Sequence, residues 1–314
     1  MTTKNQNLAR ADATLAQFES NGGLLLPEQA NAFIDMVLDE PTILKQVRTV
    51  RMGAGKVKIN RLGFGSRIAR AARRTGSAND NGSNDRYVLK ADRAAPTSTQ
   101  IELSDDEVIA EIRLPYELLE DNIEGQSMES HVMRLIAQQL ALDLEELALW
   151  GDTGSVDTYL ALQDGWLTRS VSHVADNLSA GVSPDLFANA MLALPQKYMR
   201  NLAQMRAFVS IANTIRYRQK VAQRMTGYGD SALQTDIPLQ AHGLKIEGAP
   251  MLAADGSGAT GLMTFPQNLL WGIRRDISVE TDKDIRSREY IIVVTARVAV
   301  QIDDEDAVVK LENI

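Results

Sequence analysis

The chain has 314 residues, of which 44% are hydrophobic and 24% are charged, values typical of a folded protein that buries a sizeable core. It contains no cysteine, which excludes disulfides, thiolate metal sites and cysteine catalysis and suits a reducing cytoplasm. The formal net charge of −8 argues against a protein whose whole surface binds nucleic acid.

Residues 1–50 are expected to form an arm rather than a domain, and they contain no apolar signal core that would indicate secretion. A helix is predicted after Pro27. It is expected to end before Pro41, because helical geometry is disfavoured for the residue that precedes a proline. The residues on its apolar face are Ala30, Phe33, Ile34, Val37 and Leu38. A strand is predicted over residues 43–52.

Residues 51–115 are expected to form an extended loop together with its base strands. Strands are predicted at 56–59, 97–103 and 108–114, and the Gly-, Asn- and Asp-rich residues 75–85 predict a mobile tip. An isolated two-stranded ribbon is marginally stable in water. We therefore expect this ribbon to lie on another copy of the same chain.

The charge of this region is divided between two segments. Residues 51–74 hold eight Lys or Arg and no acid, whereas residues 101–121 hold eight Asp or Glu and one Arg. We therefore expect the basic segment to dock on an acidic surface of a neighbouring copy. The candidate contact residues are Arg67, Arg70, Arg73, Arg74, Glu102, Asp105, Asp106 and Glu107. Arginine-rich segments also bind phosphate backbones, but no aromatic residues are interleaved between Arg67 and Arg74 for base stacking.

The longest predicted helix runs from Ser127 to Trp150. Apolar residues recur at helical spacing, and a second stripe of small apolar residues widens the buried face. Ser127 is the predicted N-cap, and Gly151 is expected to be a left-handed C-terminal cap. Charged residues interrupt the helix too often for a membrane span.

The remainder of the chain mixes helices and strands. Ser183 and Pro184 predict a helix start, a buried strand is predicted over residues 205–210, and a helix over 211–225. From Leu244 onward the pattern indicates strands, which end in a long alternating segment from Tyr290 to Ile302.

Four motifs suggest chemistry, but each has a simpler structural interpretation. The DTGS string at 152–155 lacks the second copy that aspartic protease chemistry needs, so a helix-capping turn is favoured. The G-x-G-x-x-G pattern at 256–261 precedes a predicted strand instead of a helix, which favours a hairpin loop. The acidic run at 303–306 is interpreted as a solvated turn. His131, His173 and His242 are isolated from one another, so no metal or cofactor site and no catalysis are expected.

The order of these parts resembles the major capsid proteins of tailed bacteriophages, an α+β fold shared with encapsulins and herpesvirus shell proteins. The strings that carry the resemblance are PEQANAFIDMVLDEPTILKQVRTVRM, LALWGDTGS, QDGWL, KIEGAPM and TFPQNLLWGIRRDISVE.

This resemblance implies a division of the chain into five parts. They are an N-terminal arm (1–50), an extended loop with its base strands (51–115), a spine-helix part of a peripheral domain (116–166), an axial domain (167–275), and returning peripheral strands with the C-terminal end (276–314).

The implied function is mechanical: hexamers and pentamers of one chain close into an icosahedral phage head that holds double-stranded DNA. Expected partners are further copies of the chain, a separate scaffolding protein, a portal and a decoration protein, with no membrane. The expected location is the virion, after assembly in the cytoplasm of a host bacterium. The alternative is an encapsulin-like compartment without a genome.

Overall fold

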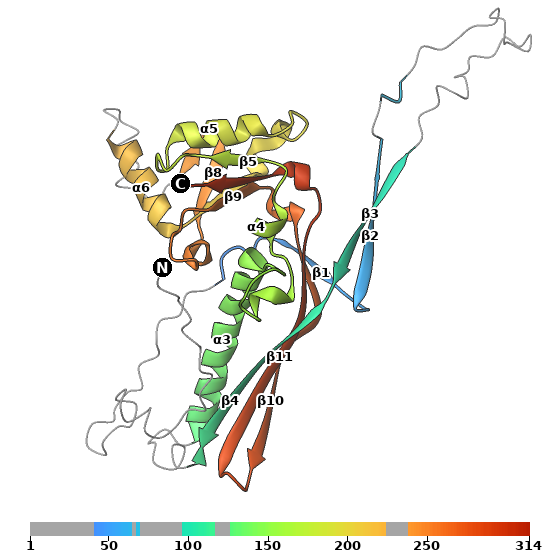
Figure 1. Cartoon of the computed structure of the whole chain (residues 1–314), viewed down its shortest axis with the longest axis vertical. Coiled ribbons are helices and arrows are strands. Elements are labelled where there is room, and N and C mark those ends of the chain that lie inside the picture. The colour runs from blue at the N-terminus through green and yellow to red at the C-terminus, as the bar shows by residue number, and fades with distance from the viewer. Residues whose placement is uncertain (1–40, 65–66, 70–95, 117–125, 224–237) are drawn as a thin grey trace, which may run out of the picture. The chain divides into compact units, whose positions relative to one another are not determined.

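A computed structural model describes residues 41–64, 67–69, 96–116, 126–223 and 238–314 (Figure 1). The chain separates into two compact units, a hairpin unit of residues 56–104 and a main unit formed by the rest. In the part of the chain that is described, no helix is long and apolar enough to cross a membrane.

The hairpin unit is an antiparallel ribbon of β2 (Lys56–Gly63) and β3 (Thr97–Ser104). The register runs from Lys56 opposite Ser104 to Gly63 opposite Thr97. The predicted ribbon is thus present, and β2 is longer than expected. Its predicted tip lies outside the described residues.

The main unit contains two sheets. The first has the order β1-β10-β11-β4, in which β1 is parallel to β10 and the other pairs are antiparallel. Its strands are β1 (Arg48–Arg51), β10 (Leu269–Asp284), β11 (Glu289–Ile302) and β4 (Asp106–Pro115). β1 pairs only with residues 270–273, so beyond Ile273 β10 has β11 as its one strand neighbour among the described residues.

The second sheet has the order β5-β12-β9-β6-β8-β7. Its strands are β5 (Val174–Asp176), β12 (Val308–Glu312), β9 (Gly261–Thr264), β6 (Arg206–Val209), β8 (Leu244–Gly248) and β7 (Gln240–Ala241). Helices α5 (Pro184–Ala193) and α6 (Ile211–Ala222) pack on it through a separate apolar cluster, where Phe187 and Tyr217 meet edge to face at 5.5 Å. Ser183 caps α5 as predicted, by accepting from the backbone N–H of Leu186.

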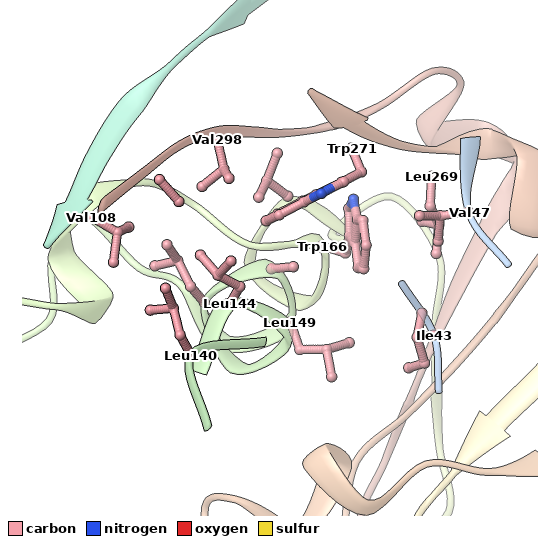
Figure 2. Packing of buried hydrophobic residues seen from close by; sticks show 14 of the residues in the cluster. Ile43, Val47, Val108, Leu140, Leu144, Leu149, Trp166, Leu269, Trp271 and Val298 are labelled. Carbon is pink, nitrogen blue, oxygen red and sulfur yellow. The ribbon is translucent and has the colours of Figure 1, made fainter. Parts of the chain in front are cut away.

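The long predicted helix is present as α3 (Gln126–Trp150), which lies along the first sheet (Figure 1). It begins one residue before Ser127, so Ser127 is inside the helix and is not its cap. Figure 2 shows Leu140 and Leu144 of α3 in the main apolar cluster, with Trp271 and Val298 of the sheet. The alternating residues predicted for β11 supply the sheet side of this core: Val294, Ala296, Val298, Val300 and Ile302 are all buried.

Two expected boundaries are corrected. The strand predicted over 43–52 is confined to β1, because residues 43–46 form a turn closed by the Gln46 N–H and the Ile43 carbonyl. The boundary expected at 275/276 falls inside β10, since bulges on either side of Arg275 interrupt the pairing without ending the strand. At the C-terminal end of the chain, β12 belongs to the second sheet.

Gly151 ends α3, but it is not the left-handed cap that the sequence predicted, because its φ is not among the positive values. Glycine is required here for another reason: the backbone at Gly151 passes close to the segment that joins α3 to α4, which we call the connector (151–165). The Gly165 N–H donates to the Gly151 carbonyl at 2.8 Å. A Cβ on Gly151 would lie 2.2 Å from the carbonyl oxygen of Gln163, and one on Gly165 would lie 2.6 Å from that of Leu149.

The connector binds the first sheet, and the end of α3 binds the turn after β8. The indole N–H of Trp166, at the start of the short helix α4 (Trp166–Arg169), donates to the Gln301 carbonyl of β11, and the Val300 N–H donates to the side chain of Gln163. On the other side, the Trp150 indole donates to the Met251 carbonyl, in the 3₁₀ turn after β8. The end of α3 is therefore the junction between the two halves of the main unit.

Glu145 attaches the root of the arm to α3. Its side chain is fully buried, and its carboxylate accepts from the Thr42 hydroxyl (3.3 Å) and from the N–H groups of Ile43 (3.2 Å) and Leu44 (3.4 Å). Burial raises the pKa of Glu145, and these hydrogen bonds oppose the rise. A second carboxylate, Glu247 of β8, accepts from the side chain of Gln46 at 2.5 Å.

We predict that Gly165→Ala destabilises the chain by about 1–3 kcal/mol, because the new methyl group meets backbone atoms that cannot move aside. Gly53→Ala is the matched control, since a Cβ there has no heavy atom within 4 Å and its φ is not positive. Urea denaturation followed by circular dichroism measures both. Equal stability of the two variants would contradict the close-crossing interpretation.

We predict that Glu145→Gln changes the pH dependence of stability. A raised pKa means that the folded state binds more protons at this site than the unfolded state, so the contribution of Glu145 to stability grows as the pH falls and is lost as the pH rises through the folded pKa. Glutamine does not titrate. The stability of the wild type relative to the variant should therefore rise from about pH 8 to about pH 5 in urea denaturation. A constant difference over that range would refute this.

Candidate assembly surfaces

The basic segment is only partly described. Arg67 is exposed, whereas Arg70, Arg73 and Arg74 lie outside the described residues. Three large apolar side chains on the same limb are exposed to water: Leu62 (77%), Phe64 (59%) and Ile68 (58%). Sequence analysis missed them, although apolar residues that recur within a basic run were a visible signal. Exposed large apolar side chains beside cations are typical of segments that bind a protein partner.

The acidic residue nearest to this limb in the ribbon, Glu102, is paired within the hairpin. Its carboxylate lies 3.0 Å from Lys56 Nζ and 3.9 Å from Lys58 Nζ, and the hydrogen bond with Lys56 lowers the pKa of Glu102. The carboxylate remains 43% exposed, so the pairs are surface contacts that contribute little to stability.

Asp105, another of the predicted contact residues, is paired within its own chain. Its side chain is only 2% exposed and lies 3.3 Å from Arg274 Nη1 and 3.2 Å from Arg297 Nε. Its N–H donates to the Gly55 carbonyl, and this hydrogen bond joins the residue that precedes β2 to the residue that follows β3. Asp105 is thus engaged inside its own chain, because β4 places it beside arginines of β10 and β11.

The two predicted contact acids at the start of β4, Asp106 and Glu107, differ in their surroundings. Burial and the neighbouring Asp105 raise the pKa of Asp106. Glu107 is 47% exposed and lies 2.5 Å from Arg275 Nη2 and 3.8 Å from Arg297 Nε. Of the predicted acidic residues, Glu102 and Glu107 therefore keep the most accessible carboxylates.

The motif at 152–155 forms a local turn, as expected. The Asp152 carboxylate accepts from the Gly154 N–H at 2.8 Å, and Thr153 donates twice to Asp164. These contacts close the turn between α3 and the connector. The Asp152 carboxylate therefore has a structural role in its own turn.

The glycine motif at 256–261 forms a turn held by Asp255, whose carboxylate accepts from the Ser257 and Gly258 N–H groups. β9 follows, as the sequence predicted. The hairpin interpretation is wrong, however, because β9 pairs with β6 and β12 and does not pair with β8.

The acidic run at 303–306 makes more protein contacts than a solvated turn would. Asp304 accepts from the hydroxyl of Tyr198, and Glu305 accepts from the N–H and hydroxyl of Ser172.

The side chain of His131 is not described, and His242 occupies the β7–β8 turn with φ +51°. Among the described residues, no group of His, Asp and Glu has a geometry that could hold a metal ion.

Solved structures with the same fold come from phage and phage-like particles. They include Microbacterium phage Oxtober96 (TM-score 0.65, 16% identity, 96% of this chain and 99% of the other), the capsid of a native GTA particle (0.65, 18%, 94% and 97%) and the capsid of Myoviridae phage XM1 (0.62, 12%, 93% and 100%). At these identities the likeness establishes the fold, which is the predicted α+β class.

No protein-family model matches the chain. A curated protein of Bacillus subtilis (strain 168), named "Putative prophage capsid protein YqbE", is 37% identical over 320 residues, which cover 99% of each chain. With this identity along nearly the full length of both proteins, the chain belongs to the major capsid protein family of tailed bacteriophages.

Proposed function

We propose that copies of this capsid protein form the hexamers and pentamers of an icosahedral head that encloses double-stranded DNA. The observation that carries the proposal is the full-length relationship to a prophage capsid protein. Closed shells require heterologous contacts between copies, and the hairpin unit offers such a contact surface. In this assembly the first sheet with α3 is the peripheral domain, and the second sheet is the axial domain.

The proposal extends to partners and location. A scaffolding protein encoded separately, a portal and a decoration protein complete the particle, and assembly takes place in the cytoplasm of the host bacterium. The chain itself performs no catalysis. The local hydrogen bonding of Asp152 and the structural contacts of Asp304 and Glu305 support that part of the proposal.

Within the shell, Arg67, Arg70, Arg73 and Arg74 dock on an acidic surface of a neighbouring subunit. Accessible Glu102 and Glu107 are candidates for that surface, and the exposed Leu62, Phe64 and Ile68 add apolar contact area along the same limb. Asp105 is left out, because its paired carboxylate is only 2% exposed, whereas those of Glu102 and Glu107 are 43% and 47% exposed.

We predict that the purified full-length chain forms rings or closed shells, because the hairpin unit exposes large apolar side chains that need a partner surface. Negative-stain microscopy and sedimentation velocity measure this. A compact monomer at every protein and salt concentration would contradict the proposed assembly.

We predict that replacing Arg67, Arg70, Arg73 and Arg74 by Ser leaves the subunit folded and lowers the assembled fraction about tenfold or more. One exposed ion pair contributes about 0–1 kcal/mol, so several must act together to produce this loss. Replacing four other exposed cations, Arg48, Arg200, Arg216 and Lys220, is the matched control. Sedimentation gives the assembled fraction and circular dichroism gives the fold.

A charge swap tests direct pairing. Glu102→Lys with Glu107→Lys should impair assembly, and adding glutamates at the four arginine positions should partly restore it. Failure of the swap to restore assembly would count against direct pairing. Normal assembly of the arginine variant with poor DNA packaging would favour phosphate binding instead.

A further inference from the structure

The chain enters and leaves the hairpin unit through two residues of the main unit, Gly55 and Asp105, which we call the root of the ribbon. The Asp105 N–H donates to the Gly55 carbonyl at 3.0 Å. This hydrogen bond lies directly next to the first pair of the ribbon, in which Lys56 is opposite Ser104. The groups around the root therefore decide how firmly the two strands are joined where they begin.

A buried charge cluster surrounds the root. The Asp105 side chain is 2% exposed, and Arg274 Nη1 donates to its two carboxylate oxygens at 3.3 and 3.5 Å. Arg297 Nε lies 3.2 Å from the same carboxylate. Because the cluster is shielded from water, removal of the Asp105 charge would leave the positive charge around it poorly compensated.

An irregularity in β10 brings Arg274 to this cluster. The β10–β11 register shifts between Ile273 and Arg275, so Arg274 is an extra residue in the strand. In a regular strand, Arg274 and Arg275 would point to opposite faces of the sheet. Here both reach acids that lie two residues apart, Arg274 at Asp105 and Arg275 at Glu107, because a β-bulge re-aims a side chain.

The root also requires a residue without a side chain at Gly55. A Cβ there would lie 2.9 Å from Asp105 Oδ1 and 3.1 Å from Arg274 Nη1. The segment before Gly55 is fixed as well, because β1 pairs with β10 up to Ile273 and the Met52 N–H donates to the Ile273 carbonyl. Both strands of the ribbon thus begin at points that the first sheet holds.

The ribbon depends on a defined register. In the described part of the chain β2 and β3 form a two-stranded sheet, and such ribbons are marginally stable by themselves. Val57 is opposite Leu103, and Lys58 is opposite Glu102. A shift of one residue would bring apolar side chains opposite charged ones and move every side chain of one strand to the other face.

We propose that Asp105 is the positioning residue of the hairpin unit: through Arg274 and Arg297 it fixes the first pair of the ribbon, and thereby the register in which the ribbon presents Leu62 and Glu102. This inference goes beyond the proposed assembly and does not rest on it, because the order of the ribbon is a property of one subunit. It can be measured whether or not the chain forms rings or shells.

The test is hydrogen exchange in the full-length Asp105→Asn variant, which keeps the shape of the side chain and removes its charge. We expect the amides of β2 and β3 to exchange about tenfold faster, while those of β9 and β12 stay unchanged, because the root opens locally and the second sheet remains folded. Mass spectrometry compares fractions of equal sedimentation coefficient, so that contacts between copies are matched.

Glu107→Gln is the matched control. It removes a carboxylate that lies close to Arg275 and Arg297 but is 47% exposed and is not at the root. Its effect on ribbon exchange should be smaller than about twofold. Unchanged ribbon exchange in a folded Asp105→Asn variant, or an equal increase in Glu107→Gln, would overturn the proposal.

A double-mutant cycle tests the pairing itself. Arg274→Gln should accelerate ribbon exchange, and adding it to Asp105→Asn should produce little further change, because both substitutions open the same pair. Fully additive effects would contradict the proposal, since they would show that the two residues act separately.

If Asp105→Asn also accelerates exchange in β9 and β12, Gly55→Ala decides. Its methyl group displaces the Asp105 carboxylate and the Arg274 guanidinium without removing a charge, and Gly53→Ala, whose Cβ has no heavy atom within 4 Å, is its control. We expect faster ribbon exchange in Gly55→Ala than in Gly53→Ala. Equal exchange in these two variants would refute the role of the root.

Discussion

The backbone crossing between Gly151 and Gly165 is the contact on which the arrangement of the two sheets depends. It requires two residues without side chains, because a Cβ at either would lie within 3 Å of backbone atoms. On this crossing Trp150 points to the 3₁₀ turn after β8, and Trp166 points to β11. The crossing therefore positions both indole groups, one against each half of the main unit.

Much of the fold could be predicted from local patterns. The apolar spacing of α3 and the alternation of β11 each depend on one face meeting one core, so sequence periodicity was enough. The cap of α5 is a contact between residues three apart, and it was predicted correctly for the same reason. The full-length resemblance then supplied the order of the parts and the capsid function.

Features that depend on distant residues could not be predicted. Gly151 was predicted to be a left-handed helix cap. A glycine is needed there because the connector passes close to it, and the sequence does not define the path of the connector. Asp105 looked like a free surface acid, yet β4, β10 and β11 bring Arg274 and Arg297 to it. The buried Glu145 gave no signal either, because its partners are N–H groups at the root of the arm, which any residue there would provide.

Among the described residues, β10 beyond Ile273 pairs with a strand on one side only, and this has a consequence for how the protein aggregates. An open strand edge is a template for stacking with other chains into fibres. Here that part of the strand carries the cations Arg274, Arg275 and Lys283 and the acids Asp276, Glu280, Asp282 and Asp284. Identical copies that stack parallel and in register along it would place each charge beside its like, and such pairs repel. This repulsion disfavours the parallel, in-register stacking on which many cross-β fibres are built.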